Sequence, residues 1–131
     1  MTVSNLGIVY YLNGDFRKAL TYLKKSFKIQ EKEKMNVGQL KLDTYIHICL
    51  VNKQIDKKNN IDKLNDIIES LEYYDFMIKY RLYEFFNDSS YLEDAFNEVQ
   101  EMAKTLTEDL KAQFFINPHV KAIVEEWHKA N

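Results

Sequence analysis

Histidine and cysteine are the residues of this sequence whose chemistry could support catalysis or metal binding. His47 and Cys49 stand two positions apart in a segment expected to be helical, so their side chains point in different directions and cannot share a metal ion. Zinc sites need several ligands at helical spacing, and the chain has no CxxC or HxxxH pattern. His119 and His128 are nine positions apart, and no carboxylate stands at a spacing from them that would indicate a catalytic pair. We therefore expect no metal site and no catalytic residue, and we interpret Cys49 as a small buried side chain.

Acidic side chains offer a second candidate chemistry, general acid–base catalysis or calcium binding. They lack the loop glycine and the alternating oxygen ligands of a calcium-binding loop, and we expect them on exposed helical faces. The glycines are scattered singly, which excludes a glycine-rich phosphate loop. We therefore expect a protein that is not an enzyme and has no cofactor. The acidic residues considered are Glu93, Asp94, Glu98, Glu101, Glu108 and Asp109.

The strongest charge feature is a basic run in the first third of the chain. Lys18, Lys25 and Lys32 recur every seven residues, whereas Lys24 and Lys28 are one helical turn apart. One interpretation is a patch for an acidic partner or a phosphate backbone. The interpretation we favour is the solvated outer face of a helix, because acidic residues interleave with the lysines. The full run comprises Arg17, Lys18, Lys24, Lys25, Lys28, Lys32 and Lys34.

The composition predicts an all-α globular chain. Its 131 residues suffice for one domain or a few small repeats, and apolar residues make up 46%. Only 3 glycines and 1 proline are present, which argues against a β-sandwich. The formal net charge of −2 gives no overall attraction to nucleic acid or acidic lipid. Because the chain has one cysteine, no long apolar run and no signal peptide, we expect a cytoplasmic protein without a membrane or nucleic-acid partner.

Apolar spacing predicts three antiparallel helix pairs at approximately residues 2–34, 37–72 and 74–106. In the first pair, Gly14 closes one helix in the left-handed conformation and Asp15 caps the next. In the second pair, we expect a long helix from about Val37 to Lys57, with Asn59 in the place of Gly14. These pairs are helical hairpins, and Gly7 is expected to be a point of close approach between helices.

The third pair and the tail have their own start and stop signals. Residues 87–89 are expected to make the third turn, and Ser90 with Glu93 forms a capping box for the helix that follows. The tail, 107–131, begins with a short helix capped by Thr107, and Pro118 opens the last helix. Its one-sided apolar face predicts a terminal cap on a stack of hairpins.

The segment Gly14-Asp15-Phe16-Arg17-Lys18-Ala19-Leu20 resembles the tetratricopeptide repeat. In the first pair, Leu6, Gly7, Tyr10, Ala19, Leu23 and Ser26 fall at the characteristic positions of that family. The third pair matches at Leu82, Phe86, Ala95 and Val99, and the second pair matches only in pattern. The resemblance covers roughly residues 2–106 and implies a short right-handed solenoid of three hairpins with a C-terminal cap. The tail is also similar to endings of tetratricopeptide regions in bacterial signalling and regulatory proteins.

The resemblance implies a non-catalytic protein–protein interaction module, or scaffold, that binds a peptide segment or a partner protein on its concave face. An alternative is a peptide-sensing regulatory region of a signalling protein or transcription regulator. The first helix has no preceding repeat to cover it, so this end is a second candidate surface. It is open to a homodimer partner or to further repeats, and the interpretation we favour is that the chain is a fragment of a longer protein. By the resemblance, the groove-facing positions are Ser4, Ile8, Tyr11, Cys49, Lys53, Tyr80, Glu84 and Asn87.

Overall fold

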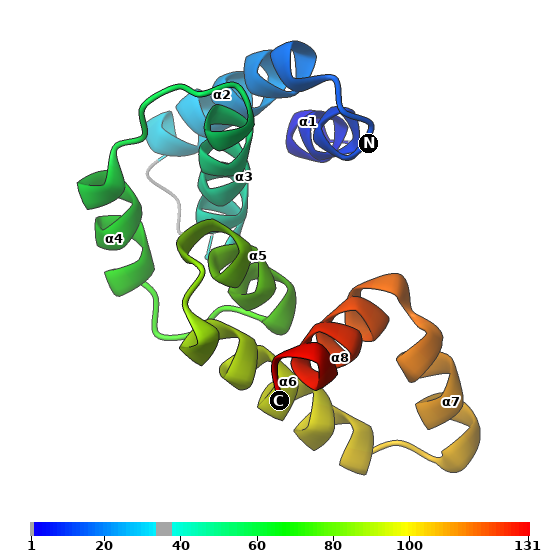
Figure 1. Cartoon of the computed structure of the whole chain (residues 1–131). Coiled ribbons are helices and arrows are strands. Elements are labelled where there is room, and N and C mark those ends of the chain that lie inside the picture. The colour runs from blue at the N-terminus through cyan, green and yellow to red at the C-terminus, as the bar shows by residue number, and fades with distance from the viewer. Residues whose placement is uncertain (1, 34–37) are drawn as a thin grey trace. The chain divides into compact units, whose positions relative to one another are not determined.

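The computed structural model describes residues 2–33 and 38–131, and all regular secondary structure in these residues is α-helical. The expected all-α class is confirmed. The chain divides into two compact units, Met1–Tyr74 (unit 1) and Asp75–Asn131 (unit 2), which are described separately (Figure 1). The arrangement of the hairpins in one solenoid domain stays a prediction. The helices of the described residues are α1 Val3–Leu12, α2 Phe16–Lys32, α3 Leu40–Gln54, α4 Ile61–Glu69, α5 Phe76–Phe86, α6 Ser89–Lys104, α7 Glu108–Ile116 and α8 Pro118–Ala130.

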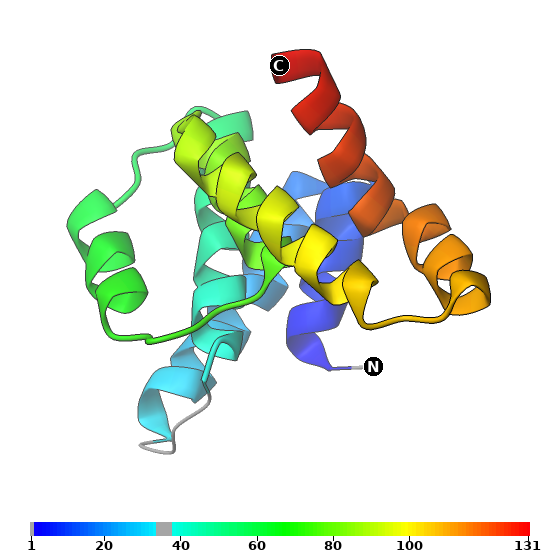
Figure 2. The same cartoon turned by 90° about the horizontal axis from the view of Figure 1, so that it is seen from below.

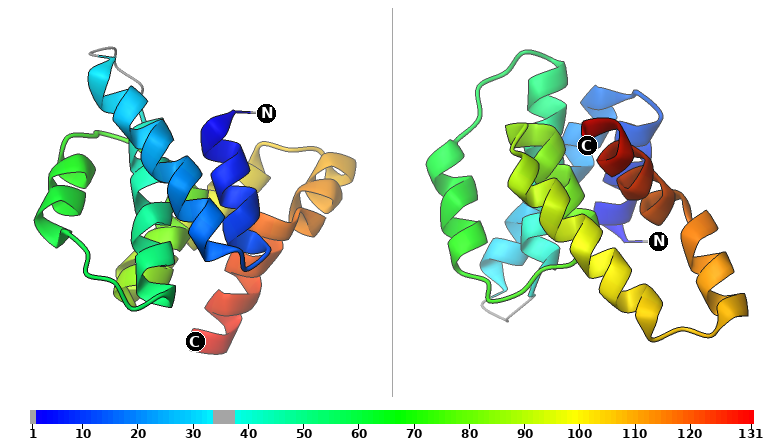
Figure 3. Two further views of the ribbon diagram at one scale, coloured as in Figure 1. Left: turned by 90° about the horizontal axis from the view of Figure 1, so that it is seen from above. Right: turned by 60° about the horizontal axis from the view of Figure 1, so that its bottom comes forward.

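The turn between α1 and α2 has the predicted chemistry. Gly14 adopts φ = 82°, and its backbone N–H donates to the Tyr11 carbonyl at 3.0 Å. The Asp15 N–H donates to the Tyr10 carbonyl at 2.9 Å, which completes a Schellman closure of α1. The Asp15 carboxylate then accepts from the Lys18 N–H and caps α2. The first hairpin is therefore confirmed, and its two helices pack along each other (Figure 3).

Close approach of α1 to α2 depends on Gly7. A Cβ atom on this residue would lie 2.7 Å from Leu23 Cγ and 3.2 Å from the Leu23 backbone nitrogen. Leu23 and Ala19 are fully buried. Gly7 is thus a close-packing point, as the sequence predicts.

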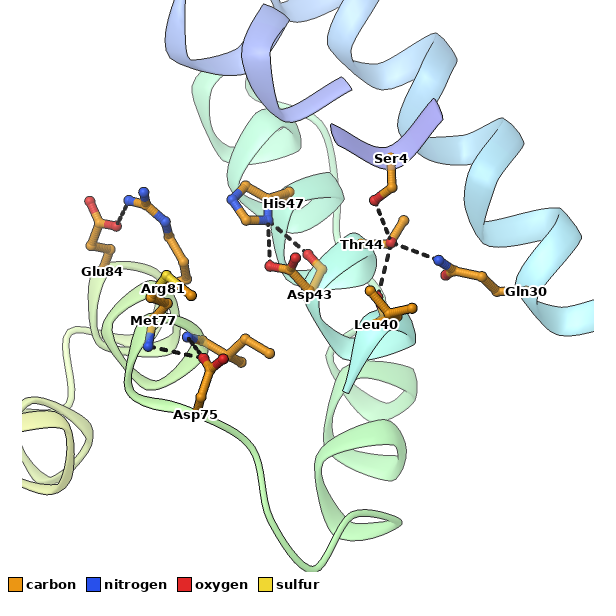
Figure 4. A network of polar contacts seen from close by, with 11 residues as sticks. Ser4, Gln30, Leu40, Asp43, Thr44, His47, Asp75, Met77, Arg81 and Glu84 are labelled. Carbon is orange, nitrogen blue, oxygen red and sulfur yellow. Dashed lines mark hydrogen bonds and ion pairs between the residues drawn. The ribbon is translucent and has the colours of Figure 1, made fainter. Parts of the chain in front are cut away.

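A hydrogen-bond network centred on Thr44 joins the first three helices (Figure 4). The Thr44 hydroxyl donates to the Leu40 carbonyl at 3.0 Å and accepts from Gln30 Nε2 at 3.0 Å. Because its single proton is used, the Ser4 hydroxyl must donate to Thr44 Oγ1, 2.9 Å away. Ser4 lies on α1, Gln30 on α2 and Thr44 on α3, so this network fixes the packing of α3 against the first hairpin.

The second helix pair differs from the sequence prediction. The expected helix from Val37 to Lys57 is α3, Leu40–Gln54, and Val37 lies outside the described residues. The left-handed residue after α3 is Asp56, with φ = 59°, and not Asn59. The Lys57 N–H donates to the Asn52 carbonyl at 2.8 Å, and this bond ends α3 as the bonds around Gly14 end α1. The connection to α4 is consequently the longer segment 55–60, which Figure 2 shows as an open loop.

Unit 2 begins with a tight helix pair. Asp75 caps α5 by accepting from the N–H groups of Met77 and Ile78 (Figure 4), and Asn87 ends it with φ = 56°. The predicted turn at residues 87–89 is thus nearly correct. The predicted capping box is wrong, because α6 begins at Ser89 and its cap is Asp88, which accepts from the Ser90 N–H at 3.0 Å. Asp88 also accepts from the Ser90 hydroxyl, and these two bonds lower the pKa of its carboxyl.

The core of unit 2 lies between α6 and α8. The Phe96 ring stacks on Trp127, with centroids 4.5 Å apart and an interplanar angle of 11°. Tyr83 on α5 donates from its hydroxyl to Glu126 Oε1 at 2.9 Å, a bond that raises the pKa of the phenol. Thr107 caps α7 and Pro118 opens α8, as predicted. The buried centre of this core consists of Leu92, Ala95, Val99, Val120 and Ile123.

Candidate functional site

The imidazole of His47 makes its polar contacts within its own helix. The ring is buried, and Nδ1 lies 2.7 Å from the Asp43 carbonyl oxygen and 3.3 Å from its carboxylate (Figure 4). A carbonyl oxygen can only accept, so Nδ1 carries the proton of this bond. Within residues 2–33 and 38–131, no three histidine, cysteine or acidic residues are grouped in a way that could hold a metal ion.

Cys49 is fully buried on α3. Burial raises the pKa of its thiol from an ordinary value of 9.0 to about 12, because a thiolate is poorly solvated there. The reactive form of cysteine is the thiolate. Cys49 is therefore a packing residue, as predicted, and it cannot also face a binding groove.

The Cys49 thiol is expected to react with a thiol reagent at pH 8 on the order of a thousand times more slowly in the native protein than in urea-unfolded protein. The raised pKa depletes the thiolate, and burial also blocks the reagent. The time course of absorbance with a disulfide reagent measures this ratio. Native labelling as fast as unfolded labelling would show that the thiol is accessible.

The predicted groove residues of unit 1 divide into two kinds. Ser4 is buried and its hydroxyl is bonded to Thr44, so it contributes to packing of α1 on α3. Ile8 and Tyr11 are half-buried, and the Tyr11 ring meets the ring of His47 edge-on at 5.8 Å. Lys53 is exposed near the end of α3. Ile8, Tyr11 and Lys53 keep accessible surface, whereas Ser4 has little.

The remaining predicted groove residues lie in unit 2. Tyr80 is half-buried and stacks on Tyr83 at 6.0 Å; burial, with Glu84 nearby, raises the pKa of its phenol. Glu84 is paired with Arg81, and Asn87 occupies the left-handed end of α5. The predicted set is thus split, with five of its members, Cys49 included, in unit 1 and three in unit 2.

A pocket of about 600 Å³ opens in unit 1 between α2, α3 and α4. This volume is in the range of cavities that hold a small ligand or a large side chain. Lysine is its commonest lining residue, and we call it the lysine pocket. It is lined by Lys24, Lys25, Phe27, Lys28, Glu31, Tyr45, Ile48, Asn52, Lys58, Asn59, Asn60 and Lys63.

Helical spacing places these residues around one cavity. Lys24, Lys28 and Glu31 follow each other at intervals of four and three, which puts them on one face of α2. The residues from α3 have the same kind of spacing, and Lys63 comes from the first turn of α4. The connection 55–60 supplies Lys58 and two asparagines. The wide α3–α4 connection, which replaces a tight turn, is what leaves room for the pocket.

The charge of the lysine pocket is strongly one-sided. Five lysines and one glutamate line it, an excess of four positive charges in a chain of net charge −2. Lys63 pairs with Glu31 at 3.2 Å. The other four lysines form no ion pair with any residue in the described part of the chain. Like charges gathered in a concave site concentrate the electrostatic potential and attract an anion.

The floor of the lysine pocket is aromatic and aliphatic. The rings of Phe27 and Tyr45 are in contact, with centroids 4.8 Å apart, and Ile48 lies one turn further along α3. The ammonium group of Lys63 lies 4.9 Å from the centre of the Phe27 ring. Burial raises the pKa of the Tyr45 phenol, and the charge of Glu31 adds to the shift. The pocket therefore combines an apolar base with a cationic rim.

One wall of the pocket is held by a pair of asparagines. Asn59 Nδ2 donates to the Cys49 carbonyl at 3.1 Å, which leaves Asn59 Oδ1 to accept from Asn52 Nδ2 at 3.0 Å. Asn52 is 9% exposed, and its side-chain amide oxygen Oδ1 accepts no hydrogen bond from the residues that the structure describes. These bonds tie the α3–α4 connection to α3, and they fix the side of the pocket from which Lys58 projects.

Asn59→Ala is expected to lower the free energy of unfolding of unit 1 by about 2 kcal/mol, because it removes the bond to the Cys49 carbonyl and leaves the side-chain amide nitrogen of Asn52 without its acceptor. Urea unfolding followed by far-ultraviolet circular dichroism measures the change. Asn65→Ala, on the exposed side of α4, is the matched control and should change stability by less than about 0.5 kcal/mol. Equal stability of the two variants would show that the asparagine pair does not hold the connection.

Part of the lysine pocket belongs to the basic run, for which the sequence favours a solvated helix face. Three members of the basic run, Lys24, Lys25 and Lys28, line the pocket, whereas Arg17, Lys18 and Lys32 are exposed elsewhere on α2. Lys34 lies outside the described residues. The one-turn spacing of Lys24 and Lys28 is the feature of the sequence that pointed to this pocket. The contributions of α4 and of the α3–α4 connection carry no comparable pattern.

Among the described residues, no helix combines the length and the apolar character needed to cross a membrane. Comparison of the chain with protein-family profiles, with curated proteins and with solved structures found no match.

Proposed function

We propose that this chain is a non-catalytic protein–protein interaction module, built of tetratricopeptide-like hairpins, that binds a peptide segment of a partner in unit 1. The lysine pocket is the observation that carries the proposal. It is large enough for a bulky side chain, has an apolar floor and has a rim of free charges. These are the features that orient and retain a peptide.

Local packing supports the comparison with tetratricopeptide hairpins. Gly7 and Leu23 meet at the place where the helices of the first hairpin approach each other, and Ala19 is fully buried beside them. Ala95 has the same full burial in the α5–α6 pair. Stacks of such hairpins commonly bind extended segments of other proteins.

The composition of the pocket favours binding over catalysis. Lysines and a single glutamate are its charged groups, and this glutamate is already paired with Lys63. General acid–base catalysis uses neighbouring titratable groups, one protonated and one not. The lysine rim does not present such a pair. The function of the rim is better explained by charge attraction.

Selection of a displayed random-peptide library on the immobilised protein tests the proposal. Enriched peptides are then titrated into ¹⁵N-labelled protein, and we expect chemical-shift changes in α2, in α3 and in the connection 55–60. Failure to enrich any peptide, or changes confined to α7 and α8, would contradict peptide binding by unit 1.

A further inference from the structure

We propose that the lysine pocket recognises an acidic peptide segment that carries one large apolar side chain. The carboxylates of this segment pair with the lysine rim, and the apolar side chain rests on the Phe27–Tyr45 floor. The inference rests on the proposed function and names the chemistry of the peptide.

The free lysines of the rim supply the first argument. Lys24, Lys25, Lys28 and Lys58 surround one cavity without an ion pair in the described residues. A single exposed ion pair stabilises a complex little, but several cations around one concave site raise the local potential and speed association with an anion. A segment with several carboxylates matches this arrangement.

Glu31 shows where a carboxylate of the partner fits. Its side chain reaches Lys63 from the neighbouring helix at 3.2 Å, and both side chains are partly exposed at the edge of the pocket. A carboxylate of an incoming peptide competes with Glu31 for the same ammonium group. Removing the charge of Glu31 therefore releases one more cation for the partner.

The floor supplies the argument for an apolar side chain. Phe27, Tyr45 and Ile48 form the base, and the methylene stems of the lysines extend this apolar surface upward. A volume of about 600 Å³ exceeds the needs of an acidic side chain alone. An aromatic or large aliphatic side chain fills this space and removes apolar surface from water, which aromatic anchors do well.

Nucleic acid matches the site less well than an acidic peptide. The aromatic rings that line the pocket are those of Phe27 and Tyr45, which contact each other and form a single platform, not a row of rings for successive bases. Stacking of bases on aromatic rings is what binds single strands. Nucleic-acid sites also follow the phosphate backbone with cations along a groove, whereas the unpaired lysines here surround one pocket.

Fluorescence anisotropy with labelled probes tests the inference. The main probe is a peptide with a central tryptophan flanked by aspartate and glutamate; one control peptide replaces the acids with asparagine and glutamine, and another replaces the tryptophan with glycine. We expect the main probe to bind at least about tenfold more tightly than either control, and its affinity to fall as salt rises. Single-stranded and duplex DNA of equal label are measured in parallel.

Charge variants locate the site. Lys24→Glu with Lys28→Glu is expected to weaken binding of the main probe at least about tenfold, while Lys121→Glu with Lys129→Glu makes the same change of net charge in unit 2 and should have little effect. Glu31→Gln is expected to tighten binding severalfold, and this gain remains a test if the double lysine variant does not fold. Circular dichroism establishes that each variant is folded.

The outcomes separate the inference from the proposed function. If library peptides bind unit 1 but the uncharged or tryptophan-free control binds as well as the main probe, the acidic-segment inference is wrong and peptide binding stands. Tighter binding of DNA than of the main probe, equal weakening by the two double variants, or no gain in Glu31→Gln would also overturn the inference. If no peptide binds at all, both proposals fail.

Discussion

Leu23→Ala is expected to lower the free energy of unfolding by about 3 kcal/mol, and this loss should shrink when Gly7→Ala is added. Leu23 is fully buried, so its truncation removes packing and leaves a cavity. Gly7→Ala alone is expected to destabilise by about 1 to 2 kcal/mol despite the helix propensity of alanine, because its Cβ would lie 2.7 Å from Leu23 Cγ. In the Leu23→Ala background the clashing side-chain atoms are gone, and the close contact that remains is with the backbone nitrogen of residue 23 at 3.2 Å.

A double-mutant cycle measured by urea unfolding reports this coupling directly. The double variant should be more stable than the sum of the single changes predicts, by at least about 1 kcal/mol. Asn5→Ala, on the exposed side of α1, is the control for alanine substitution in this helix and should change stability by less than about 0.5 kcal/mol. Strict additivity of Gly7→Ala and Leu23→Ala would mean that their contact does not determine the approach of α1 to α2.

Ile123→Ala is expected to destabilise unit 2 by about 2 to 5 kcal/mol. Ile123 is fully buried on α8, in the core shared with Leu92 and Val99 of α6. Few cores of this size can close around the lost atoms without leaving a cavity. Truncation should therefore weaken the packing that holds α8 against α6.

Trp127 provides the measurement for Ile123→Ala. It is the single tryptophan of the chain and stacks on Phe96, so its fluorescence reports the unfolding of unit 2. Glu125→Ala, on the exposed face of the same helix, is the matched control and should leave the midpoint of denaturant unfolding almost unchanged. A midpoint for Ile123→Ala within error of the control would show that the α6–α8 core is not closely packed.

Turns and helix caps were predictable from the sequence where the local backbone conformation favours one residue type. Gly14 takes the left-handed conformation that ends α1, and Pro118 begins α8 because its missing N–H costs nothing there. The same reasoning was wrong at Asn59, because Asp56 is also short enough for the left-handed region and comes first. It was wrong at Ser90 for a similar reason, because Asp88 is an equally good cap two residues earlier.

The candidate site was harder to predict than the helices. The groove positions taken from the tetratricopeptide resemblance lie only on the first helix of each hairpin. Two of them, Ser4 and Cys49, are buried between helices. The lysine pocket instead draws on a second helix, on α3, on α4 and on the connection 55–60. Residues so far apart in the chain share no periodicity that a single sequence could reveal.

The sequence by itself determined that the chain is helical, where most helices begin and end, and that Gly7 and Cys49 belong to the packing. These properties depend on local interactions, namely helical periodicity, capping and backbone conformation. Only the tertiary structure decided that lysines from α2, from α4 and from the connection before it surround one apolar floor. That decision depends on how α4 is held away from α3, through the Asp56 closure and the Asn52–Asn59 pair, and long-range placement of this kind is set by packing.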